Sequence, residues 1–467
     1  MFKHTKTFFL LGSILSLSLL AACGSSSTTP TPEPTPEPTP VGGVSTTSGG
    51  LATINTGSSV IGFIPVGLTV LAVPLDTGSA SDSVSGLSKA TLRSANLSID
   101  VSFTINSCGA DATDLKVVCV GYTSSMVAIL DVADYVATLQ DGGTPTADEI
   151  TVSEVDLGNT DSASFSGGSC TNCGVLCDAG ESRFIVSSGD GYRVLDYSGT
   201  VLTSYLTDLT SDPVRDLGTE NFSFDSENKW IISPEYETSN NYLWIVDLTN
   251  DAVYRWTNRM VPTSTDATNG LEELSSDMVA DAASVDPTTG ALLIGDEYAD
   301  SFLTVNLNAA TFDDAAGTFT APHDYVTMTN IVAPGLMSTG MAIESSSHLL
   351  FLEDEFGSSM GLVSLPTAAA AGSISLSDYT TAAIPSPTAT CASVFSWSNV
   401  GDPHGLALFT GVIDDAPKGL LINSDKTCAA IVDLDSFLAA DDATTPHSVD
   451  PTIDLEATGV ITFISLE

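Results

Sequence analysis

The chain has 467 residues, with 58 Asp and Glu against 13 Lys and Arg, for a formal net charge of −45. This balance excludes nucleic acid as a partner, because phosphate binding takes its affinity from clustered Lys and Arg. It also disfavours adsorption to anionic lipid headgroups. Hydrophobic residues make up 43% of the chain and charged residues only 15%, which excludes an acidic disordered protein.

Residues 1–22 have the pattern of a secretory signal peptide. Lys3 and Lys6 precede an apolar run over 8–20, which is too short to cross a hydrocarbon core of ~30 Å. The run ends on Leu20-Ala21-Ala22-Cys23, which resembles the lipobox of bacterial lipoproteins. The resemblance implies cleavage before Cys23, its acylation, and anchoring in the cell envelope through the acyl chains. An ordinary signal peptide with a chance cysteine is the alternative.

Two further expectations follow from this segment. Gly24 after the cysteine, rather than Asp, favours the outer membrane over the inner by the habit of the lipoprotein family. Cleavage removes two Lys and no acids, so the mature chain keeps 11 basic residues against the same 58 acids, a formal charge of −47.

Residues 23–50 are predicted to form a lipidated N-terminus and a disordered tether rich in Pro, Thr and Ser. Pro stands at alternate positions over 30–40. These prolines remove hydrogen-bond donors and favour extended polyproline II, a semi-rigid spacer of ~3 Å per residue. The tether is therefore expected to hold the next domain away from the membrane.

Residues 51–467 are predicted to be all-β and repetitive. Short apolar runs lead into polar or acidic segments, and each copy closes with an alternating strand, as in Leu243-Trp244-Ile245-Val246-Asp247. The anchor residues that recur at the end of this strand lie 51 to 69 residues apart: Pro74, Asp131, Asp196, Asp247, Asn306, Ser364 and Asp433. A repeat of roughly sixty residues with about four short strands is typical of β-propeller blades.

The phrase around Asp247 resembles the blades of YVTN and WD40-like propellers, without the Trp-Asp dipeptides of true WD40 repeats. The resemblance implies a β-propeller over 51–467. Seven blades are expected, six or eight remain open, and a β-helix or tandem sandwiches are the competing architectures. Both chain ends are expected to pair in one blade, with the weak strand 52–54 and the last strand 459–466.

Acidic residues concentrate in the loop between the second and third strand of three consecutive repeats. Clustered carboxylates suit Ca²⁺, which takes six to eight oxygen ligands. A merely acidic surface is the alternative interpretation. The candidate metal ligands are Glu235, Glu237, Asp296, Glu297, Asp300, Glu353, Asp354 and Glu355.

A second candidate site lies where the chain enters inner strands. His404 follows Asp402 in Gly401-Asp402-Pro403-His404-Gly405, and Glu220-Asn221 occupy the corresponding place in another repeat. Such a set resembles the metal-centred pockets of propeller lactonases and esterases, where a cation activates water or a carbonyl. His404 as a structural turn residue is the alternative. The G-x-S-x-G match at 357–361 is rejected, because a strand and no helix follows it.

Seven cysteines remain after Cys23, in a compartment where disulfides persist. Cys108 with Cys119 and Cys391 with Cys428 are the candidate pairs, and Cys170, Cys173 and Cys177 are expected to hold a third bridge and a spare thiol. A metal site in the last group lacks a nearby His as fourth ligand.

The sequence favours a binding module over an enzyme, since no dense catalytic motif is present. The expected function is a lipid-anchored propeller in the envelope or on the cell surface that binds a protein or glycan, with Ca²⁺ as the one cofactor suggested. A metal-dependent hydrolase or lactonase at the channel mouth is the alternative.

Overall fold

The computed structural model divides into two units, Met1–Thr39 and Pro40–Glu467. The first unit lies outside the described residues, as do Cys23 and most of the tether. In the second unit the structure describes residues 45–46, 51–57, 59–75, 97–121, 124–157, 174–188, 191–206, 217, 222–235, 241–260, 263–266, 270–273, 280–296, 301–327, 338–354, 359–368, 371–374, 376, 378–383, 406–411, 416–422, 428–440 and 458–465.

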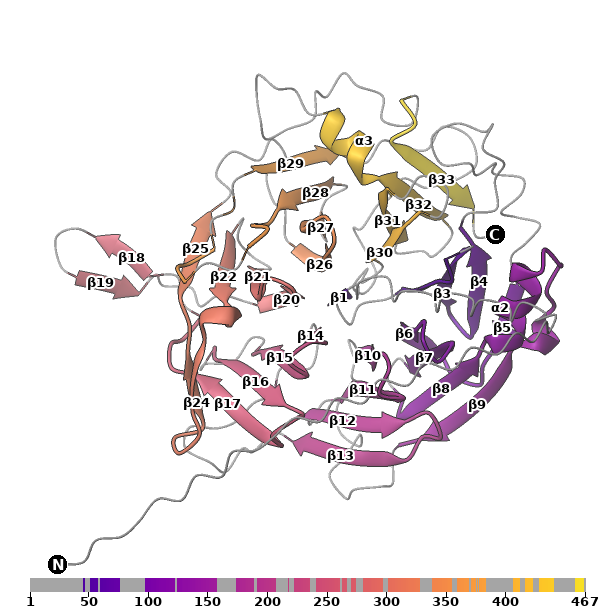
Figure 1. Ribbon diagram of the computed structural model, residues 1–467, viewed down its shortest axis with the longest axis horizontal. Coiled ribbons are helices and arrows are strands. Elements are labelled where there is room, and N and C mark those ends of the chain that lie inside the picture. Colours follow the sequence, from indigo (N-terminus) through magenta and orange to yellow (C-terminus); the bar gives the residue numbers. More distant parts are fainter. Residues whose placement is uncertain are drawn as a thin grey trace, which may run out of the picture. The chain divides into compact units, whose positions relative to one another are not determined.

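The described residues of the second unit form a seven-bladed β-propeller, as the repeat predicts (Figure 1). Each blade contains four antiparallel strands in chain order, further strands extend two of the seven sheets, and blade 1 is the sheet closest to the N-terminus in sequence. The strands that line the central channel are β2 (Ala52–Asn55), β6 (Ile105–Asp111), β10 (Val175–Asp178), β14 (Ser223–Asp225), β20 (Ala280–Asp286), β26 (Ser338–Glu344) and β30 (Leu406–Thr410).

The second strand of each blade pairs with the first and the third. The second strands are β3 (Val60–Val66), β7 (Lys116–Gly121), β11 (Arg183–Ser188), β15 (Trp230–Pro234), β21 (Ala291–Asp296), β27 (Leu349–Asp354) and β31 (Pro417–Ile422). The third strands are β4 (Thr69–Pro74), β8 (Met126–Asp131), β12 (Gly191–Asp196), β16 (Leu243–Asp247), β22 (Ser301–Asn306), β28 (Ser359–Ser364) and β32 (Cys428–Asp433). All seven predicted anchor residues are therefore the last residues of third strands.

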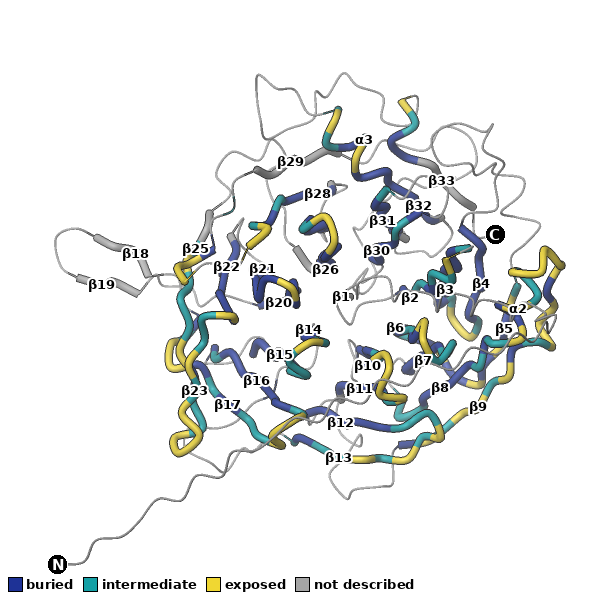
Figure 2. Tube along the Cα trace, in the orientation of Figure 1, coloured by how far each residue is buried: buried dark blue, intermediate teal, exposed yellow. Residues whose placement is uncertain are grey.

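Where their burial is described, the outer strands are mostly less buried than the inner ones, and Figure 2 shows this increase in exposure toward the rim in blades 2, 3 and 4. They are β5 (Leu97–Asp100), β9 (Thr151–Asp156), β13 (Val201–Leu206), β17 (Ala252–Trp256), β25 (His323–Thr327), β29 (Asp378–Ala383) and β33 (Ile461–Ser465).

The hydrophobic core lies between the blades rather than within one layer. Among the described residues, buried side chains form seven clusters, and each cluster joins two neighbouring blades. Strand β3 shows how the alternation works: Ile61 and Phe63 pack toward blade 2, whereas Val60 and Ile64 pack toward blade 7. Because both faces of a strand are buried, the inner strands are apolar on both faces, without the alternation of a half-exposed sheet.

Two glycines let neighbouring blades approach each other closely. A Cβ added at Gly109 of β6 would lie 2.8 Å from the backbone oxygen of Val175 in blade 3. A Cβ at Gly419 of β31 would lie 2.5 Å from the ring of Phe351 in blade 6. Both contacts are closer than a methyl group tolerates, so blade spacing at these points depends on glycine.

The ring closes in a way that the sequence analysis predicts incorrectly. All four strands of blade 1 are N-terminal and all four of blade 7 are C-terminal, so the two chain ends do not share a sheet. Closure instead comes from side chains between the inner strands. Thr53 Oγ1 donates to the Leu408 oxygen at 3.3 Å, and Asn55 Nδ2 donates to the Thr410 oxygen at 3.1 Å. These bonds and a shared apolar cluster hold blades 1 and 7 together.

A short N-terminal strand, β1 (Ser45–Thr46), lies in the central channel (Figure 1). It pairs antiparallel with β26, with Ser45 opposite Ile343 and Thr46 opposite Ala342. It also lies against β14 and β20, so inner strands of blades 4, 5 and 6 surround it. This strand belongs to the segment 23–50 that the sequence analysis assigns to the tether.

Several blades have additional helices and strands inserted after the third strand. Helix α2 (Ala133–Gln140) and the 3₁₀ turn η1 (Ala147–Glu149) follow the third strand of blade 2, and α3 (Leu434–Ala439) follows that of blade 7. In blade 5 the third strand is followed by η2 (Leu307–Ala309), β23 (Thr311–Asp313) and β24 (Thr318–Thr320). Strand β24 pairs parallel with β17 and so covers the outer edge of blade 4. Strands β18 (Thr263–Asp266) and β19 (Gly270–Glu273) form a separate hairpin.

The ring has two faces with different connections. Since strands alternate in direction, the connections from first to second and from third to fourth strand share one face, here named the turn face. The connections from second to third strand and from blade to blade share the other, here named the loop face. In the described part of the chain, no helix is both long and apolar enough to span a bilayer.

Candidate functional site: buried acids around the channel

The innermost strand of blades 2 to 6 ends on an acidic residue at the turn face. These residues are at most 3% exposed: Asp111, Asp178, Asp225, Asp286 and Glu344. Four positions later each turn has a residue with φ between 51° and 66°, immediately before the second strand: Leu115, Ser182, Lys229, Gly290 and His348. The five blades therefore repeat one turn of constant length around the turn-face end of the channel.

In blades 2, 4, 5 and 6 the acid holds this turn by accepting backbone N–H groups inside it. Asp225 Oδ1 accepts the N–H groups of Glu227 and Asn228, both at 3.0 Å. Glu344 accepts those of Ser346 at 3.1 Å and Ser347 at 2.7 Å. A short acidic side chain that bonds the backbone two and three residues on is the usual stabiliser of such turns. Asn55 does the same in blade 1, where Oδ1 accepts the Gly57 N–H at 2.9 Å.

The same acids also contact the next blade. Lys229 Nζ of blade 4 lies 2.6 Å from Asp178 Oδ1 of blade 3, and Arg183 binds the other oxygen of Asp178 within its own blade. His348 Nδ1 of blade 6 lies 2.7 Å from Asp286 Oδ2 of blade 5. These contacts come from the positive-φ position of the following blade, so that position joins one turn to the previous one.

Blade 5 breaks this series, because its positive-φ residue is Gly290 and has no side chain to reach Asp225. No cation pairs with Asp225 among the described residues. Burial raises the pKa of Asp225, its hydrogen bonds from Asn228 and Glu227 offset this only in part, and the charge of Asp286 adds to the rise. Glu344 differs: burial opposes its ionisation, but hydrogen bonds from Ser347 and Ser346 outweigh burial and lower its pKa.

The sequence analysis did not single out this ring of acids as a set. The signal is present in the sequence, because Asp225 and Asp286 are each followed by turn-forming residues, Ser226 to Asn228 and Pro287 to Gly290. The sequence alone does not show how these turns align across the blades. That alignment places the five carboxylates at the same end of the inner strands, around the channel.

Four of the predicted calcium ligands are described, and they lie at the loop-face end of the second strands of blades 4, 5 and 6. Glu235 is fully buried, with Oε1 accepting from Trp244 Nε1 at 2.7 Å and Oε2 from the Tyr242 N–H at 3.0 Å. Asp296 is the last residue of β21, and Glu353 and Asp354 end β27. The remaining candidates lie outside the described residues: Glu237, Glu297, Asp300 and Glu355. No group of three or more potential ligands gathers within the part of the chain that is described.

The residues of the alternative hydrolase site have no described positions in the structure. Glu220 and Asn221 immediately precede the buried Phe222, and Asp402 and His404 precede β30, but all four lie outside the described residues. The hydrolase interpretation therefore stays a prediction.

The cysteines are partly described. Cys108 and Cys119 face each other across β6 and β7 and form the predicted disulfide, with Cα atoms 4.1 Å apart. Cys177 forms no disulfide among the described residues, and burial raises the pKa of its thiol. Cys170, Cys173 and Cys391 lie outside the description, and Cys428 is described only as part of β32.

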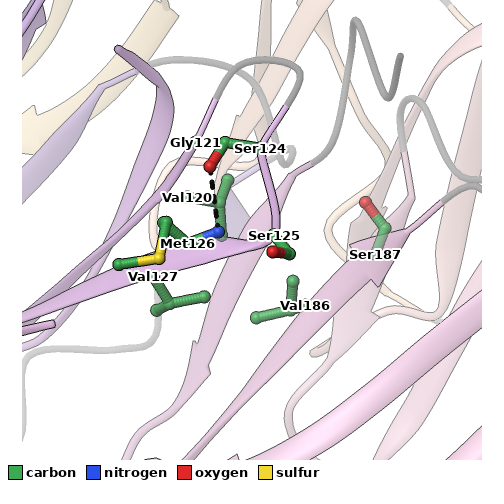
Figure 3. Close-up of a pocket in the computed structure, with 8 residues that line it drawn as sticks. All are labelled: Val120, Gly121, Ser124, Ser125, Met126, Val127, Val186 and Ser187. Carbon is green, nitrogen blue, oxygen red and sulfur yellow. Dashed lines mark hydrogen bonds between the residues drawn. The ribbon is translucent and has the colours of Figure 1, made fainter. Parts of the chain in front are cut away.

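One small depression lies between blades 2 and 3 on the loop face (Figure 3). Its cavity volume is only about 10 Å³, and it is lined by Val120, Gly121, Ser124, Ser125, Met126, Val127, Val186 and Ser187. Its hydroxyls have partners: Ser125 donates to Asp156 at 2.5 Å, and Ser187 accepts the Gly174 N–H at 2.8 Å. It is smaller than the pockets that usually hold a drug-sized ligand, ~300–1,000 Å³.

No family model matches the chain, and no curated protein sequence matches it. Solved structures match over most of its length. A functionally unknown protein from Desulfotomaculum acetoxidans is 10% identical, with a TM-score of 0.41, over 89% of this chain and 99% of that one. The β-propeller domain of Cps50 (Swd1) from Myceliophteria thermophila is 11% identical, with a TM-score of 0.46, over 84% and 99%. Apo AztD from Citrobacter koseri is 11% identical, with a TM-score of 0.39, over 83% and 84%. Values this low carry no argument about function.

Proposed function

We propose that this protein is a lipid-anchored propeller of the bacterial envelope whose loop face binds a protein or glycan ligand. The observation that carries the proposal is the direction of β1. Because β1 is antiparallel to β26, its Ser45 end lies toward Glu344 and the turn face. The N-terminal end of β1 therefore points toward the turn face. We therefore assign ligand binding to the loop face, at the opposite end of the ring.

The chemistry of the two faces supports the same assignment. The turn-face acids of blades 2 to 6 are buried and bonded to their own turns or to the next blade, so they serve the ring itself. The loop face has the acidic connections of blades 4, 5 and 6, which the sequence analysis proposes as Ca²⁺ ligands. Oxygen-rich loops with a bound cation offer a surface for hydroxyl or carboxylate groups of a ligand.

The anchor is tested by feeding cells an alkyne-bearing fatty acid and isolating the protein. Label on the N-terminal peptide that begins at Cys23 is expected, with none in Cys23→Ser. Unlabelled wild-type protein with a free N-terminus would contradict the anchor and leave an ordinary secreted protein.

The calcium site is tested by calorimetric titration of the purified mature protein with Ca²⁺. Binding is expected in the wild type and in Glu181→Gln/Glu227→Gln, a control in which two exposed turn-face acids are neutralised. The loop-face triple variant Glu237→Gln/Glu297→Gln/Glu355→Gln should lose it, because one ligand is removed from each blade. No heat of binding in the wild type, with no change in Tm between EDTA and millimolar Ca²⁺, would remove the cation from the proposal.

A further inference from the structure

The channel-facing edge of β26 is occupied by a segment of this same chain. Ser45 pairs with Ile343 and Thr46 with Ala342, a contact of only two residues. Gly42-Gly43 precede the strand and Gly49-Gly50 follow it. Register is weakly specified in Gly-rich strands, and a short pairing contributes little stability. The occupant is therefore held loosely compared with the strands inside the blades.

Elsewhere in the channel, side chains from the neighbouring blade bind the free edge of an inner strand. Ser223 Oγ of β14 accepts the Val285 N–H of β20 at 3.2 Å. Ser223 stands two residues before the acid of its blade, and Val285 stands one residue before the acid of the next blade. This geometry shows which backbone N–H of an inner strand faces the channel.

The same positions in the next pair of blades are Ser284 and Ile343. Ser284 is fully buried, and its hydroxyl has no hydrogen-bond partner among the described residues. Ile343, whose N–H Ser284 would accept by analogy with Ser223, is the residue paired with Ser45. A buried hydroxyl without a hydrogen-bond partner is rare in folded proteins, because it loses its bonds to water without replacing them. Here β1 explains the missing bond, because β1 occupies the edge of β26 that the Ser284 hydroxyl would otherwise bind.

We propose that the inner edge of β26 is a binding site for an extended peptide strand, filled in this structure by residues 45–46, and that Ser284 is the group that takes over when the strand leaves. The site recognises its ligand by adding a strand to a free sheet edge, through main-chain hydrogen bonds. Release of β1 from this edge costs little free energy. The Ile343 N–H loses its partner in β1 but can then donate to Ser284 Oγ. The site thus holds the tether in the channel and can release it.

The test measures amide hydrogen exchange of Ile343 in the mature full-length protein. Ser45→Pro/Thr46→Pro removes the N–H groups of β1 and is expected to speed exchange at Ile343 by severalfold, with Val285 unchanged. Ser284→Ala alone is expected to leave the exchange rate of Ile343 within about twofold of the wild-type rate, because the hydroxyl makes no hydrogen bond while β1 is bound. The three substitutions together should speed exchange by about a further tenfold, because both partners are then absent.

Two controls make the result specific. Ser223→Ala should speed exchange at Val285 and leave Ile343 unchanged. A synthetic peptide of residues 41–50, added to Ser45→Pro/Thr46→Pro, should restore the protection of Ile343, whereas the same peptide with Pro at positions 45 and 46 should not. Equal exchange of Ile343 in the wild type and in Ser45→Pro/Thr46→Pro, or failure of the peptide to restore protection, would overturn the strand site. Faster exchange in Ser284→Ala alone would overturn the takeover by Ser284.

Discussion

At Asp178 one fully buried carboxylate receives Arg183 from its own blade and Lys229 from the next. Burying an acid is tolerated only when charge and hydrogen bonds compensate it. The turn acids of the other blades obtain this compensation differently, from backbone N–H groups, serine hydroxyls, His348 or Tyr197. The acid at this position thus stabilises the turn of its own blade and also contacts the next blade.

Lys229→Met tests the seam at blades 3 and 4. Asp178 would keep Arg183 but lose the bond across the blades, and a destabilisation of about 1–3 kcal/mol is expected from a buried charge that loses a partner. Lys116→Met is the matched control, because its partner Asp131 is 47% exposed. An exposed pair contributes only about 0–1 kcal/mol. Chemical denaturation of both variants measures the difference, and equal losses would contradict the special role of the buried acid.

Glu344 and Asp225 predict opposite dependences of stability on pH. The pKa of Glu344 lies below its ordinary value of 4.5, so its contribution to stability is present above about pH 4.5 and is lost as the pH falls through the lowered folded-state pKa. The pKa of Asp225 is raised, so its protonated form favours folding, and stability is lost as the pH rises through the folded-state pKa.

Tm measured against pH in the acid range tests this. Glu344→Gln should flatten the loss of Tm on acidification relative to the wild type. Asp225→Asn should steepen it, because it removes a group that stabilises the fold as it takes up its proton. Identical slopes in both variants would show that neither carboxyl titrates as its surroundings indicate.

At the scale of the strands, blade packing is set by how closely two sheets approach. Gly109 of β6 faces the backbone of β10, which cannot move without shifting blade 3. Gly109→Ala should therefore cost about 1–3 kcal/mol by overpacking. Gly372→Ala is the control, because a Cβ at Gly372 meets nothing within 4 Å. Denaturation midpoints compare the two, and a neutral Gly109→Ala would mean that the blades are more loosely packed than described.

The strands were predictable because each one has its own local pattern. The residues that end third strands, such as Asp247 and Asn306, follow apolar runs and precede turn-forming residues, so periodicity places them without tertiary information. The strand pair β17 and β24 was not predictable, because it is parallel and joins segments of two blades. The same holds for the pair of Ser45 and Ile343, because the two residues are distant in sequence and Ser45 lies in a Gly- and Ser-rich stretch without apolar alternation.

The candidate site was predictable only in part. The sequence identifies acids and their loops, but burial decides their role. Glu235 is bonded to Trp244 and Tyr242 within its own hairpin, a contact that its loop sequence alone does not indicate. Conversely, Asp178 acquires its importance from Lys229, a residue of a different repeat. Roles of this kind depend on which blades are neighbours.

For the whole molecule, the ring closes without exchanging strands between its ends. Thr53 and Asn55 bond the backbone of blade 7, and the shared apolar cluster supplies the rest of the seam. Blade closure therefore does not use β1, whose residues Ser45 and Thr46 pair with β26 in the channel. The antiparallel pairing of β1 with β26 places Ser45 toward the turn face and Thr46 toward the loop face.

The most direct test of this account is the position of the tether relative to the two faces. Spin labels carried by non-cysteine amino acids at Pro40 and at Glu227, on the turn face, give one distance by pulsed electron resonance. Labels at Pro40 and Leu68, on the loop face, give a second; both Glu227 and Leu68 are exposed. The account predicts a shorter and narrower distance from Pro40 to Glu227 than to Leu68. A shorter distance to Leu68, or two equally broad distributions, would contradict it.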